Sequence, residues 1–129
     1  NDNPVYYVQY AHARICSVKR KLEAQGLASR PLLEDLAVDR LVEGDETELI
    51  KQLGRFPEIV ERAAESAEPQ QIATYLRDLA GQFHSYYNAH KVIVDDEQLR
   101  MARLALSEAV RQVVRNGLDL LGVSAPETM

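Results

Sequence analysis

Tyrosine is the residue type in this sequence whose distribution is most unusual. The chain has six tyrosines, no tryptophan and only two phenylalanines, and four of the tyrosines form two adjacent pairs, Tyr6-Tyr7 and Tyr86-Tyr87. A tyrosine can bury its ring while its hydroxyl stays in water, so a core position is the default for any single one. We expect core positions for Tyr75 and one member of each pair, and a functional surface for Tyr7 and Tyr87.

Residues around these tyrosines could recognise an unpaired nucleic-acid base. Such a base offers a ring face and hydrogen-bonding edges, which proteins meet with aromatic side chains, arginine planes and amides. The chain supplies these groups in Tyr7, Gln9, Tyr10, Arg14, Tyr87 and Asn88. Spacing alone leaves a structural role open for each of them.

Other kinds of site chemistry find no support in the sequence. The histidines His12, His84 and His90 and the single Cys16 fit no zinc-binding spacing. The six glycines form neither a P-loop nor a dinucleotide-binding motif. The carboxylates fall in helix-capping turns or on exposed faces. We therefore expect no metal, no cofactor and no catalytic residue in this chain.

Length and charge narrow the class of protein. The 129 residues are about one domain's worth, so we expect a single domain over residues 1–129. The net charge of -5 argues against a protein that coats nucleic acid through bulk charge alone. Residues 1–30 nevertheless carry five Lys or Arg against two Asp or Glu, and a solvated helix face remains the simpler explanation of that excess.

The sequence also bears on the compartment. A lone Cys16 cannot form an intrachain disulfide, which suggests a reducing environment. No stretch approaches the ~18 apolar residues of a membrane span, and no signal peptide opens the chain. We expect a cytoplasmic protein without a membrane partner. The start at Asn1 rather than Met suggests a piece of a longer protein.

The residues that could bind a base must be positioned by helices, of which the first is the clearest. Asn3 before Pro4 predicts a capped helix start, and Gly26 predicts its end. One stripe of this helix is apolar and predicted to be buried: Val8, Ala11, Ile15, Val18 and Leu22. A second stripe, about 100° around the helix, combines aromatic and polar residues: Tyr7, Tyr10, Arg14, Ser17 and Lys21.

The middle of the chain predicts a connection and two short helices. Residues 27–44 should form a connection with a short helical turn, pinned by Leu32, Leu33, Leu36 and Leu41. Asp45 and Glu48 resemble a capping box, and Leu49, Leu53 and Phe56 should form the apolar face of the helix that follows. Pro57 should end or kink that helix, and a short helix should restart there and stop before Pro69.

Two longer helices should complete the chain. Apolar spacing predicts a helix over residues 70–88 and, after a loop containing His90 and residues 92–94, a last helix capped by Asp95 or Asp96. The inner face of this last helix is predicted to hold Leu99, Ala102, Leu106, Val110, Val113 and Leu120. Close packing would explain Gly117 in mid-helix, and Gly122 suits the helix end. The predicted fold is an all-α bundle of about five helices, with residues 124–129 trailing off.

The run from Tyr7 to Arg14, YVQYAHAR, resembles the YxQYAHxR segment that opens the C-terminal anticodon-binding (DALR-type) domain of arginyl-tRNA synthetases. Further similarities follow in the same order along the chain: Phe56-Pro57, Tyr75-Leu76, Tyr86-Tyr87-Asn88, residues 102–106 and Gly122. The resemblance covers essentially the whole chain.

The resemblance implies a part of a class I arginine–tRNA ligase, an aminoacyl-tRNA synthetase that uses ATP with Mg in a catalytic domain absent here. The implied partners are that catalytic domain and the anticodon loop of arginine tRNA, whose central base is always cytosine. The implied tRNA-binding residues are Tyr7, Tyr10, Arg14, Tyr87 and Met129, with Gln9 and Asn88 added. Thr128 stands where the family commonly has arginine, so a phosphate contact made by that arginine is missing.

Two interpretations from other classes remain as alternatives. A helical protein-interaction module would share the all-α pattern, but should show a large exposed apolar patch and no preference for tRNA. An autonomous enzyme would need site chemistry that the sequence does not offer.

Overall fold

The computed structural model describes residues 3–129, so the chain start at Asn1 lies outside the described part. Five α-helices account for most of it: α1 (Pro4–Ala24), α2 (Gly44–Gly54), α3 (Phe56–Ser66), α4 (Gln70–Ala89) and α5 (Glu97–Leu120). Two short 3₁₀ helices, η1 (Leu33–Asp35) and η2 (Val38–Arg40), connect α1 to α2. Residues 3–129 contain no β-strand. The predicted all-α bundle of about five helices is confirmed.

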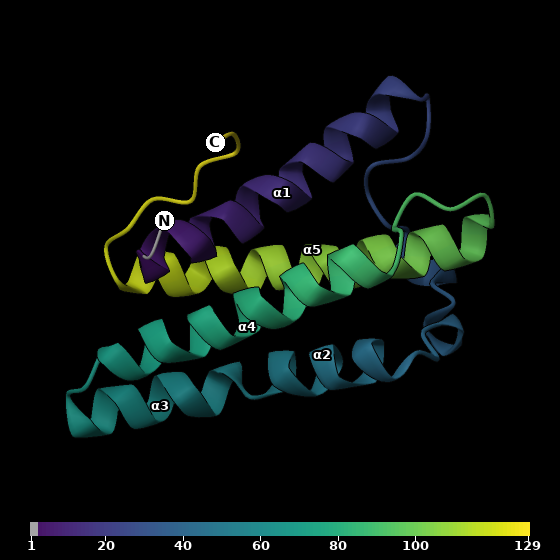
Figure 1. Cartoon of the computed structure of the whole chain (residues 1–129). Coiled ribbons are helices and arrows are strands. Elements are labelled where there is room, and N and C mark those ends of the chain that lie inside the picture. Colours follow the sequence, from purple (N-terminus) through teal and green to yellow (C-terminus); the bar gives the residue numbers. More distant parts are fainter. Residues whose placement is uncertain (1–2) are drawn as a thin grey trace.

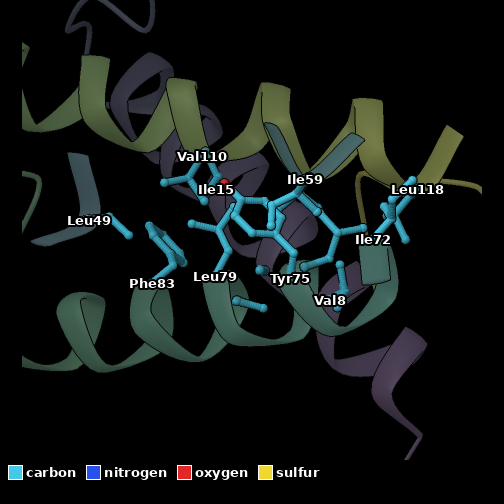
Figure 2. Close-up of a cluster of buried hydrophobic side chains, with 14 of the residues drawn as sticks. Val8, Ile15, Leu49, Ile59, Ile72, Tyr75, Leu79, Phe83, Val110 and Leu118 are labelled. Atoms are coloured by element: carbon cyan, nitrogen blue, oxygen red, sulfur yellow. The ribbon is translucent and has the colours of Figure 1, made fainter. Parts of the chain in front are cut away.

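Helix α4 lies at the centre of the bundle and contacts each of the other four helices. Helices α1 and α5 pack against one side of it, while α2 and α3 follow one another along the other side (Figure 1). The core side chains come from all five helices and include Ile15, Leu49, Ile59, Phe83 and Val110 (Figure 2). No helix within residues 3–129 combines the length and the apolar character that a membrane crossing requires.

Helix α1 forms as its sequence predicts. The side chain of Asn3 accepts a hydrogen bond from the Val5 amide at 2.9 Å, which satisfies one of the unpaired donors at the helix start. At the other end Gly26 adopts a φ of 72°, which glycine tolerates best. The five residues of the predicted apolar stripe are all buried. The neighbouring polar and aromatic stripe is therefore turned away from the core.

The connection between α1 and α2 differs from its prediction. Leu32 and Leu33 are 68% and 78% exposed, so they do not pin the segment. Leu36 is half-buried, and Leu41 packs against the core cluster. The two 3₁₀ helices have no buried residue of their own, so the segment runs over the surface and Leu32 and Leu33 remain exposed to solvent.

The start of α2 is shifted by two residues from the prediction. Glu43 is the capping residue, and Glu46 completes the capping box by accepting a hydrogen bond from the Glu43 amide at 3.2 Å. Asp45 instead contacts His90, with 3.1 Å between Oδ2 and Nε2. The predicted capping box of Asp45 and Glu48 was therefore wrong. Aspartate is a commoner capping residue than glutamate, so the sequence favoured Asp45 over Glu43.

The buried face of helix α5 differs near its C-terminal end from the face that the sequence predicts. Asp96 caps it by accepting from the Leu99 amide, as predicted. The buried face continues from Val110 through Val114 and Leu118, while Leu120, predicted to face inward, is 56% exposed. Gly117 confirms the expectation of close packing, because a Cβ atom added there would lie 2.6 Å from Leu76 Cδ2 of α4.

Candidate functional site

The contact between α1 and α4 brings an arginine and two aromatic rings of the predicted set together. The guanidinium carbon of Arg14 lies 4.1 Å from the ring centroid of Tyr87 and 5.2 Å from that of Tyr10. Both distances allow attraction between the cation and the ring faces. Arg14 Nη1 also lies 3.0 Å from His84 Nδ1. The planar guanidinium is thereby held in one orientation beside Tyr87.

His84 belongs to this arrangement, and the sequence analysis missed it. Its ring stacks on Tyr10 with 5.3 Å between centroids and lies 4.8 Å from Tyr7. Since Nδ1 accepts from Arg14, Nε2 carries the proton and faces the Tyr7 carbonyl at 3.5 Å. Burial lowers the pKa of His84, which favours this neutral form. A signal was present, because His84 precedes Tyr87 by one helical turn and shares its face.

Residues 124–129 do not trail off as predicted, but fold back along α1 (Figure 1). Three side chains of α1 meet tail carbonyls: Gln9 Nε2 lies 2.9 Å from Ser124 O, His12 Nδ1 3.0 Å from Pro126 O, and Arg20 Nη1 3.2 Å from Glu127 O. His12 is buried, and burial lowers its pKa. These contacts place Met129 beside the second stripe of α1.

The C-terminal tail (residues 124–129), α1 and α4 line an open cavity of about 500 Å³. Four of the seven predicted site residues line it: Tyr10, Arg14, Tyr87 and Met129. Ala13, Ser17, Arg20, Lys21 and Thr128 complete its lining. The volume lies in the range of roughly 300–1,000 Å³ that is typical of ligand sites. Two tyrosine rings, a stacked arginine and an exposed methionine thus line one cavity.

The other three predicted residues lie outside this lining. Tyr7 is 38% exposed, and its ring contacts that of His84. Gln9 uses its amide to hold the tail. Asn88 is exposed beside Tyr87. Of the tyrosines expected in the core, Tyr75 and Tyr86 are buried, whereas Tyr6 is 42% exposed, so that expectation was wrong for Tyr6.

The electrostatics of the cavity favour an anionic ligand. Arg14, Arg20 and Lys21 line it, and no acidic residue of the described chain does. Lys19, on the same helix, is instead paired with Glu108 of α5 at 3.1 Å. Residues 3–129 contain no group of three or more His, Cys, Asp or Glu side chains arranged to hold a metal ion. The cavity therefore suits stacking and phosphate contacts.

Comparison with known proteins relates this geometry to a family. A family model described as DALR anticodon binding domain matches residues 8–129. The arginine–tRNA ligases of Thioalkalivibrio sulfidiphilus and Halorhodospira halophila are 57% and 59% identical over 128 residues, which are 99% of this chain and 22% of each ligase. The solved Thermus thermophilus arginyl-tRNA synthetase has a TM-score of 0.77 at 38% identity, covering 95% of this chain and 21% of that one. The chain thus spans about a fifth of the length of the relatives it matches.

Proposed function

The chain belongs to the DALR anticodon-binding domain family, and we propose that it binds the anticodon loop of arginine tRNA as one domain of a longer arginine–tRNA ligase. The observation that carries this proposal is the cavity where Arg14 lies against Tyr87 opposite the tail residue Met129. Proteins that bind single-stranded loops use stacking faces and arginine planes of this kind.

The geometry suggests how one base would be held. An unstacked base entering the cavity would meet the rings of Tyr10 and Tyr87 and the guanidinium plane of Arg14, with Met129 on the opposite side. Arg20 and Lys21 lie at the same cavity and suit phosphate oxygens. We propose that this base is the central cytosine of the anticodon, because every arginine anticodon has it.

The remaining predicted residues take supporting places in this proposal. Tyr7 positions His84, which in turn holds Arg14. Gln9 fixes the tail that carries Met129. Exposed Asn88 follows Tyr87 directly and contacts a base edge or the RNA backbone in this proposal.

The rest of the ligase would supply the catalytic step. We propose that the attachment of arginine, with its ATP and Mg, takes place in a catalytic domain outside this chain, in the cytoplasm. The described residues offer no donor set for a metal ion. Four exposed aliphatic residues of the α1–α2 connection are available to contact that domain: Leu32, Leu33, Val38 and Val42.

Binding of short RNA hairpins to the purified chain tests the proposal. The arginine anticodon stem-loop should bind more tightly than the same hairpin with guanine at the central position. Removing an aromatic platform typically costs about 1–3 kcal/mol per base, so Tyr87→Leu should weaken binding to the cytosine hairpin and narrow the difference between the two RNAs.

Tyr6→Leu is the matched control, because Tyr6 is an exposed tyrosine on α1 outside the cavity lining. It should leave both affinities unchanged. Equal binding of the two hairpins by the unmodified chain would refute the proposal. A large loss of stability in Tyr87→Leu with the preference intact would identify Tyr87 as a core residue only.

A further inference from the structure

A second, smaller cavity lies beside Tyr87, next to the one that Met129 lines. It has a volume of about 200 Å³ and is formed by the C-terminal half of α1, the end of α4 and the loop that follows α4. Its lining includes Val18, Lys21, Tyr87, Lys91, Val92 and Ile93. Lys21 and Tyr87 line both cavities. The two cavities are therefore neighbours that share a wall.

The walls of this second cavity are fixed by the core. Val18 and Val92 are 3% and 4% exposed and belong to a small hydrophobic cluster between α1 and α5. The loop backbone is held from α5, because Arg103 Nη1 donates to the Lys91 carbonyl at 2.8 Å and Arg100 Nη1 to the Val94 carbonyl at 3.0 Å. A preformed wall avoids the free-energy cost of ordering a loop when a ligand binds.

The chemistry of the lining suits a flat ring attached to an anion. Val18, Val92 and Ile93 give an aliphatic surface beside the Tyr87 ring. Lys21 and Lys91 are exposed, and neither has an ion-pair partner within residues 3–129.

The carboxylate of Asp45 lies near this cavity, because it contacts His90. Asp45 lies 3.1 Å from Nε2 of His90, which is also in the lining. Asp45 contacts that imidazole and does not itself line the cavity, so the charged side chains in the lining are those of Lys21 and Lys91. A base with its phosphate has the matching combination of an apolar face and negative charge.

We propose that this cavity receives the base of a second unpaired nucleotide, adjacent in the RNA strand to the one in the larger cavity. Lys21 and Lys91 contact the phosphate between or beside the two nucleotides. The inference rests on the proposed function, and adds Val18, Lys91 and Ile93 to the RNA-binding surface. Consecutive nucleotides are covalently linked, so two cavities that share the Tyr87 wall suit them.

The test combines protein variants with abasic RNA. In two hairpins, one nucleotide on either side of the central cytosine is replaced by an abasic one. With the unmodified chain, one of these changes should weaken binding by about 5- to 150-fold, the range for loss of one stacked base. Ile93→Trp, which fills the cavity, should weaken binding of the intact hairpin and make that abasic change nearly without effect.

Lysine variants provide an independent measurement that does not disturb the core. Lys91→Gln should weaken binding and reduce the slope of log K against log salt by about 0.7, the value for one single-strand phosphate contact. Lys51→Gln is the matched control, because Lys51 is an exposed lysine on α2 with only a surface partner, Glu48. It should change neither affinity nor slope.

The outcomes separate this inference from the proposed function. If the unmodified chain still prefers central cytosine, but Ile93→Trp leaves the abasic effects unchanged, the second cavity holds no base and the inference is overturned alone. If Ile93→Trp does not fold, an unchanged affinity and slope for Lys91→Gln overturn it. If the unmodified chain shows no preference for central cytosine, the proposed function is overturned as well.

Discussion

Replacing Arg103 by methionine should destabilise the fold strongly, because it removes one half of a buried ion pair. Arg103 Nε donates to Glu46 Oε2 at 3.0 Å, and the Glu46 side chain is fully buried. Glu46 also accepts a hydrogen bond from the Tyr86 hydroxyl at 2.5 Å. Burial, together with this carboxylate, raises the pKa of Tyr86, so the phenol stays a donor. Arg103 is the only cation within residues 3–129 that is paired with Glu46.

The magnitude follows from what Arg103→Met leaves behind. The Glu46 carboxylate would remain out of water with two neutral donors, the Tyr86 hydroxyl and the Glu43 amide. Removing one partner of a buried pair typically costs about 3–5 kcal/mol, because the other charge is left uncompensated. The Lys91 carbonyl would also lose its donor. Stabilities of domains are roughly 5–15 kcal/mol, so the variant should fold but unfold at much lower denaturant.

Urea denaturation followed by far-ultraviolet circular dichroism measures this loss. Arg62→Met is the control, since Arg62 and Glu58 form an exposed pair at 3.7 Å that should contribute less than about 1 kcal/mol. The double variant Glu46→Gln/Arg103→Met removes both charges and should be more stable than Arg103→Met alone. A loss below about 1 kcal/mol for Arg103→Met, or a double variant that is less stable than the single one, would refute the reasoning.

Three further stability predictions use the same measurement. Gly117→Ala should destabilise the chain, because overpacking against Leu76 at 2.6 Å costs about 1–3 kcal/mol and exceeds the helix-propensity gain of about 1 kcal/mol; an increase in stability would show that Leu76 moves aside freely. Ala67→Gly should stabilise the chain by about 1 kcal/mol, because Ala67 ends α3 with a φ of 54°; no gain would mean that this conformation is unstrained. The free energy of unfolding should fall as the pH drops below about 6.5, because burial lowers the pKa of His12 and His84, so the unfolded chain binds more protons. The fall should be shallower in His12→Asn, and an equal pH dependence in that variant would remove His12 from the explanation.

The sequence predicted the start of a helix correctly where a single capping residue determines it. Asn3 and Pro4 begin α1, and Asp96 caps α5, because caps depend on residues a few positions apart. The buried stripe of α1 followed from helical spacing alone. The leucines of residues 32–41 were not predictable in this way, since burial of a connection depends on which distant surface it meets.

The sequence pointed to candidate site residues but could not show how they come together. Tyr10, Arg14 and Tyr87 were chosen for their chemistry, yet their stacking depends on a contact between helices more than 60 residues apart in the sequence. The role of His84 and the return of the tail along α1 depend on equally distant contacts. Sequence spacing describes one helix face at a time, so it cannot show which two faces meet.

The distribution of ion pairs explains how a chain with a net charge of -5 can have unpaired lysines at the proposed RNA-binding surface. Lys19 and Arg111 both pair with Glu108, and Arg103 pairs with Glu46, so these cations are used within the fold. Lys21 and Lys91 have no ion-pair partner within residues 3–129 and are available to a ligand near the contact between α1 and α4. The proposed complex would make few phosphate contacts, so bulk attraction would be weak and binding would depend on stacking at Tyr87 and Arg14. An interface of this composition gains little from the backbone common to all RNAs and most from the bases, which favours discrimination over affinity.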